Sequence, residues 1–157
     1  MNTPEVFAKM QYDWAISSNT LEHIEDDKKA LYRIVENARM KTAIILVPAL
    51  SCLYGTCDHD GGHLRRYSKV SFKKLTEDTG LKLDGFFYFN MLGAIAWWVQ
   101  YVLLRIQNYS DKSHLRCYTI FDRYITPSYS KLEGKLDCPF GLSLVARVTL
   151  ADSRREI

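Results

Sequence analysis

Residues 70–102, VSFKKLTEDTGLKLDGFFYFNMLGAIAWWVQYV, decide the fold that we expect from the sequence. Ser71 can cap a short helix that ends at Gly80, because serine favours helix starts and glycine favours helix ends. Leu81 opens a second apolar run, interpreted as a longer helix, which passes through Gly93 into a strand-like segment. A short helix, a glycine turn, a longer helix and a strand are typical of a helix-turn-helix within a winged-helix domain.

The residues before this stretch predict helices. Residues 1–20 are interpreted as a short helix followed by the polar linker 17–20. Residues 22–40 carry apolar side chains at helical spacing, with acidic residues at the start and basic residues at the end, which complements a helix dipole. Residues 43–54 are apolar all round and are therefore expected to be buried.

The residues after it predict strands. Residues 64–70 are interpreted as a short strand, and residues 97–107 and 115–125 as the two strands of a hairpin, because they are rich in aromatic and β-branched side chains. Residues 142–150 alternate apolar and polar side chains, a period typical of a half-buried strand.

The expected fold class is therefore α+β: N-terminal helices, then a winged-helix-like unit with an antiparallel β-hairpin, then a C-terminal strand. We expect one domain over residues 1–157, since 157 residues form a single core of ordinary size. Within it we expect a helical appendage at 1–41, the winged-helix-like unit at 42–125, and a C-terminal strand and tail at 126–157.

Composition limits the class of protein. The chain is 47% hydrophobic and 25% charged, a mixture typical of a globular domain. Residues 85–104 carry no formal charge, but Asn90, Gln100 and a mean hydropathy of −0.19 favour buried core over a membrane span. With no secretory signal pattern and no recognised cysteine framework, we expect a cytoplasmic protein without a membrane partner.

Charge placement suggests nucleic acid as the partner. Residues 63–74 hold five basic and no acidic side chains, and a further set lies on the expected longer helix and hairpin. Basic side chains near a helix-turn-helix can neutralise phosphates, while Lys82 and Asn90 are side-chain types that read base edges. The predicted nucleic-acid-binding residues are Arg65, Arg66, Lys69, Lys73, Lys74, Lys82, Asn90, Lys112 and Arg116, with Arg123 extending the set.

These residues predict a small non-enzymatic DNA-binding protein of winged-helix type, such as a regulator or replication accessory factor of a mobile element. The alternative is a protein-binding factor, an inhibitor of or adaptor to a host machine, which uses an aromatic-rich surface. The oligomeric state is left open, with a homodimer as one possibility.

A second alternative is a small zinc-dependent enzyme or zinc-stabilised module. Cys52, Cys57, His59 and His63 are ligand types that zinc accepts, but their spacing matches no common zinc finger. No phosphate-binding glycine loop, nucleophile elbow or dinucleotide fingerprint occurs. The sequence therefore predicts no catalytic residue, no cofactor and no committed metal site.

Overall fold

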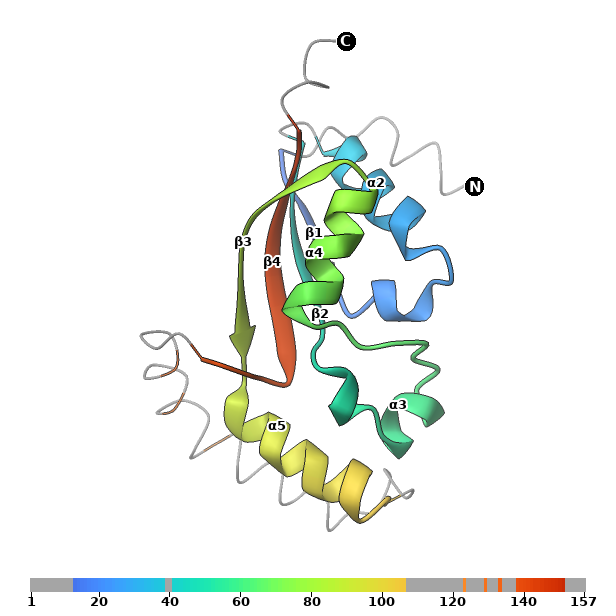
Figure 1. The fold of residues 1–157 in the computed structure, drawn as a ribbon, viewed down its shortest axis with the longest axis vertical. Coiled ribbons are helices and arrows are strands. Elements are labelled where there is room, and N and C mark those ends of the chain that lie inside the picture. The colour runs from blue at the N-terminus through green and yellow to red at the C-terminus, as the bar shows by residue number, and fades with distance from the viewer. Residues whose placement is uncertain are drawn as a thin grey trace.

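The structure, a computed structural model, describes residues 13–38, 41–106 and 138–151 together with Arg123, Tyr129 and Glu133. Over these residues the fold is mixed α+β, a four-stranded mixed sheet with helices (Figure 1). Lys112 and Arg116 of the predicted DNA-binding set, and the expected strand at 115–125 apart from Arg123, lie outside the described residues.

The sheet has the strand order β1-β2-β4-β3. Strands β1 (Ala15–Ser18) and β2 (Thr42–Pro48) are parallel and are joined through helix α2 (Asp27–Asn37). Strand β4 (Ser143–Leu150) lies between β2 and β3 (Leu81–Phe89) and is antiparallel to both. A parallel strand–helix–strand unit is thus continued by antiparallel strands.

Helices α2 and α4 (Lys69–Asp78) cover the same face of the sheet (Figure 1). Leu31 and Val35 of α2 and Phe72 of α4 are buried in one apolar cluster with Ile45 and Val148 of the sheet. Burial of this face supplies the main apolar driving force for folding.

The remaining helical segments are short and follow strands. Segment η1 (Leu21–His23) follows β1, and η2 (Ser51–Leu53) and α3 (Thr56–Asp60) follow β2. Helix α5 (Met91–Trp97) follows β3 and continues as the π-helical segment η3 (Trp98–Leu103). No helix in the described part of the chain is long and apolar enough to cross a membrane.

Two sequence predictions are confirmed. Residues 143–150 form β4, because their alternation buries Leu144, Ala146 and Val148 on one face. The short basic helix forms as α4, although its cap is Ser68, whose side chain accepts from the Ser71 N–H at 3.0 Å. Gly80 follows this helix with φ 68°, a left-handed conformation that glycine tolerates.

The prediction of a second, longer helix from Leu81 is wrong. Residues 81–89 form strand β3, whose backbone pairs with β4 along its length apart from a register shift between Leu83 and Gly85. Pairing with a strand about 60 residues later in the sequence overrides the apolar pattern that suggested a helix. In the described residues, α4 is therefore followed by a strand, and the helix order of a winged helix is not found.

The prediction of a strand at residues 97–107 is wrong as well. Residues 91–103 are helical, and Trp97 and Tyr101 lie one helical turn apart with their rings 4.6 Å from each other. Asn90 starts this helix, since its side chain accepts from the Gly93 N–H at 2.8 Å.

Three further expectations need correction. Residues 15–18, expected to end a short helix and begin a linker, form β1, while residues 1–12 of that expected helix lie outside the described residues. Within the described residues 22–38, the helix expected over 22–40 spans Asp27–Asn37. Residues 64–70 contribute one isolated bridge, Ala49 to Tyr67, in place of a strand.

Candidate functional site

Polar side chains gather beside the carboxyl ends of the two parallel strands. Glu22 and His23 lie on η1, which follows β1 after two residues, while Asp58, His63 and Arg66 lie on α3 and the loop after it, which follow β2. The two loops are tied together by a backbone hydrogen bond from the Leu64 N–H to the Glu22 carbonyl, at 2.7 Å. In open α/β sheets, ligands bind beside the carboxyl ends of the parallel strands.

Asp58 and Arg66 form a buried ion pair at the base of the cluster. The Arg66 Nε donates to both carboxylate oxygens of Asp58 at 2.9 Å, and its Nη1 donates to the Ala49 carbonyl at 3.1 Å. The Arg66 guanidinium also lies 4.8 Å from the ring centroid of Trp97. Asp58 accepts a further hydrogen bond from the Gly55 N–H at 2.9 Å, so its charge is paired and its oxygens are occupied.

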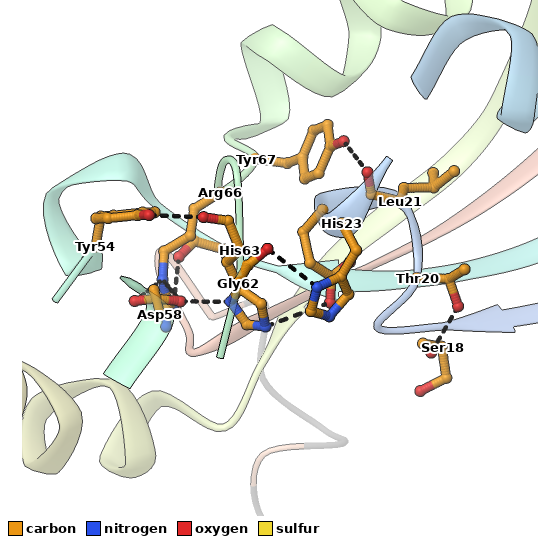
Figure 2. Close-up of polar contacts among 12 residues, drawn as sticks. Ser18, Thr20, Leu21, His23, Tyr54, Asp58, Gly62, His63, Arg66 and Tyr67 are labelled. Carbon is orange, nitrogen blue, oxygen red and sulfur yellow. Dashed lines mark hydrogen bonds and ion pairs between the residues drawn. The ribbon is translucent and has the colours of Figure 1, made fainter. Parts of the chain in front are cut away.

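His63 is oriented by Asp58 (Figure 2). The His63 Nδ1 lies 2.7 Å from Asp58 Oδ1, and because a carboxylate accepts hydrogen bonds, Nδ1 carries the proton in this contact. The lone pair of the neutral ring is then on Nε2, which points away from Asp58. A carboxylate behind a histidine in this way is the usual support of a metal-ligating imidazole.

His23 is held in a comparable way from the other side. Its Nδ1 lies 3.2 Å from the Gly62 carbonyl oxygen, which can only accept, so Nε2 again keeps the lone pair. The His23 and His63 rings meet edge to face with their centroids 4.7 Å apart (Figure 2). Two imidazoles therefore present their free nitrogens in the same small region.

The Glu22 carboxylate is the unusual member of the cluster. Its side chain is fully buried, and neither oxygen has a hydrogen-bond partner among the described residues. The His63 Nε2 lies 3.9 Å from the Glu22 Oε1, too far for a hydrogen bond. Burial raises the pKa of Glu22 above its ordinary value of 4.5.

Glu22, His23 and His63 together form a three-residue ligand cluster. One ligand atom from each lies within 4.8 Å of the other two. Among the described residues, this is the group of histidine, cysteine and carboxylate side chains with the spacing to hold a metal ion.

Three of the predicted DNA-binding side chains, those of Arg65, Arg66 and Lys69, contact other groups of the protein. Arg65 pairs with Asp27 at 2.8 Å, and Arg66 is buried against Asp58. The Lys69 ammonium lies about 5 Å from the centroids of the Phe86 and Tyr88 rings.

The other described residues of the predicted DNA-binding set are Lys73, Lys74, Lys82 and Asn90. Lys73 is on α4 and pairs loosely with Glu77 at 3.8 Å, and Lys74 is exposed beside it. Lys82 is on β3, 3.5 Å from Asp84, while Asn90 caps α5. DNA binding by the described part of this set stays a prediction, with Lys73, Lys74 and Lys82 as its exposed members.

The four zinc candidates are not brought together. His63 belongs to the ligand cluster, but Cys52 is exposed and His59 pairs at the surface with Asp60, 3.3 Å away. Cys57 is half-buried, and burial raises the pKa of its thiol, which disfavours the thiolate that metals bind.

Sequence reasoning missed Glu22, His23 and Asp58. The signal that was present is a Glu-His pair directly after a short apolar-polar segment, at the position where a strand ends. Reading residues 17–20 as a linker concealed that strand end. No protein-family model matches the chain, and a search of curated proteins finds no match.

Proposed function

We propose that this chain binds one divalent transition-metal ion through Glu22, His23 and His63. The observation that carries the proposal is the fully buried Glu22 carboxylate, unpartnered among the described residues, beside the free nitrogens of two oriented histidines. Two imidazole nitrogens and one carboxylate oxygen form a ligand set that Zn²⁺, Fe²⁺, Co²⁺ and Mn²⁺ accept.

The energetics of Glu22 favour a cation over a purely structural role. A buried carboxylate without hydrogen bonds is energetically unfavourable, and an apolar side chain at the same position would avoid this cost. A divalent ion bound between Glu22 and the two imidazoles would coordinate a carboxylate oxygen and neutralise the buried negative charge.

The surroundings resemble the outer shell that metal sites require. The Nδ1 atoms of His63 and His23 are directed at a carboxylate and a backbone carbonyl, which fixes the ring orientation before any ion arrives. The Asp58–Arg66 pair in turn fixes the carboxylate. A preoriented set of this kind binds a metal ion without first reorganising.

A three-residue ligand set also implies reactive chemistry. Structural zinc sites usually have four protein ligands, whereas catalytic sites have three and leave positions for water or substrate. An ion held by Glu22, His23 and His63 would act as a Lewis acid and would lower the pKa of a bound water.

Calorimetric titration of chelator-treated protein with Zn²⁺, Co²⁺ and Mn²⁺ tests the proposal. We expect binding of one ion per chain, lost in Glu22→Gln and in His23→Ala. The matched control is His59→Ala, which removes an exposed histidine outside the cluster and should leave binding unchanged. Equal affinity in the Glu22 variant and the control, or no binding by the unmodified protein, would refute the proposal.

A further inference from the structure

We propose that the metal ion of this site binds a small anionic molecule that chelates it through two adjacent oxygen atoms, as an α-hydroxy carboxylate does. This inference rests on the proposed metal site and specifies the chemistry of its ligand. It follows from the number of protein ligands, the charge of the site and the direction from which the site is reached.

The number of protein ligands leaves room for a chelating molecule. Asp58 is the nearest further carboxylate, but its oxygens are occupied by Arg66, His63 and the Gly55 N–H. The described residues therefore supply three ligands. An octahedral ion with three protein ligands would keep three further positions, and two adjacent ones would fit a two-oxygen chelate.

The charge of the site favours an anion. A divalent ion with the Glu22 carboxylate and two neutral imidazoles carries one net positive charge. The neighbouring charges cancel in pairs, since Arg66 is paired with Asp58 and Arg65 with Asp27. A molecule with one negative charge would neutralise the site, and a neutral molecule would leave it charged.

The site is reached from the side of the histidines. Glu22 is fully buried, whereas the His63 side chain is 20% exposed and His23 is exposed. Tyr54 and Leu64 are exposed, and the Tyr54 hydroxyl donates to the His63 carbonyl at 2.6 Å. A small molecule would therefore reach the ion past the two imidazoles.

Three probes test separately whether the bound molecule needs a second oxygen and whether it needs a negative charge. The readout is the visible absorption of the Co²⁺-loaded full-length protein. Lactate carries both a carboxylate and an adjacent hydroxyl, propionate lacks the hydroxyl, and propane-1,2-diol lacks the charge. We expect lactate to change the spectrum at a concentration about tenfold lower than propionate, because the second oxygen binds intramolecularly. The diol is expected to be weaker than lactate as well.

The outcomes distinguish this inference from the metal site itself. The chelate proposal would be overturned if the protein shows a bound Co²⁺ spectrum that propionate, or the diol, changes at the same concentration as lactate does. The metal site would still stand in that case. Absence of a protein-bound Co²⁺ spectrum would overturn both. The His59→Ala variant should reproduce the lactate response of the unmodified protein.

Discussion

At the scale of single residues, the burial of Glu22 sets the properties of the site. Its side chain is fully buried, and neither carboxylate oxygen has a hydrogen-bond partner among the described residues. Burial favours the protonated form and so raises the pKa of Glu22. Removal of the charge should therefore stabilise the metal-free protein while it removes the metal ligand.

Glu22→Gln is expected to raise the unfolding free energy of the metal-free protein by about 1–2 kcal/mol at neutral pH, because a neutral amide is cheaper to bury than a carboxylate. Urea denaturation of chelator-treated protein measures this difference. The same variant should gain no stability from added Zn²⁺. A destabilised Glu22→Gln protein would show that the carboxylate is satisfied by contacts within the fold.

The raised pKa of Glu22 should also make the stability of the metal-free protein depend on pH. The folded-state pKa of Glu22 lies above its ordinary value of 4.5. As the pH rises from 4.5, the unfolded chain therefore loses the Glu22 proton before the folded chain does. The contribution of Glu22 to stability therefore falls across that window and levels off above the folded-state pKa. Denaturation midpoints measured against pH should show this fall in the metal-free protein, and Glu22→Gln should remove it.

Asp58 is expected to act through His63. Asp58→Asn alone would leave Arg66 buried without its anion, a change of about 3–5 kcal/mol that threatens the fold. The double variant Asp58→Asn with Arg66→Met removes both charges and should fold. Calorimetry should then show Zn²⁺ affinity about 10–100-fold weaker, since the carboxylate that fixes the His63 ring is gone. Unchanged affinity would exclude a positioning role for Asp58.

At the scale of elements, the sequence predicted those whose determinants are local. The alternation of β4 lies within the strand, and the Ser71 and Gly80 signals lie within or close to α4. Strand β3 was missed because its partner β4 begins at residue 143, and the apolar run Phe86–Phe89 fits either structure until that partner is known. The helical structure of residues 97–103 was missed because their aromatic and β-branched content suggested a strand.

Asn90 marks the junction of β3 and α5. It has φ 64°, and its side chain accepts from the Gly93 N–H. Asn90→Ala should destabilise the protein by about 1–2 kcal/mol, through loss of the cap and strain at a positive φ. Asn90→Gly should cost less, because glycine tolerates that φ. Equal losses for the two variants, measured by denaturation, would contradict this account of the junction.

At the scale of the whole molecule, the site could not be read from sequence because the sheet assembles it. Glu22 and His63 are separated by 40 residues, and they meet because β1 and β2 are parallel neighbours with their loops on the same edge. His63 was among the zinc candidates, but its predicted companions Cys52, Cys57 and His59 were its neighbours in sequence. The sequence shows which residues are of a type that can bind a metal ion. Which of them lie together in space depends on the order and direction of the strands.

Metal binding should stabilise the molecule as a whole. An ion that binds only the folded chain adds about 2.7 kcal/mol to the unfolding free energy when its free concentration is 100 times the dissociation constant. A thermal melt with and without Zn²⁺ should show this increase in the unmodified protein and in His59→Ala. No increase should occur in His23→Ala.

The most direct test of the metal site is the anomalous scattering of a crystal soaked with Zn²⁺. We predict one strong peak about 2.0–2.2 Å from a Glu22 oxygen and from the Nε2 atoms of His23 and His63. A peak at Cys57 or His59 with none at Glu22, or no protein-bound peak at all, would contradict the assignment of this cluster as a metal site.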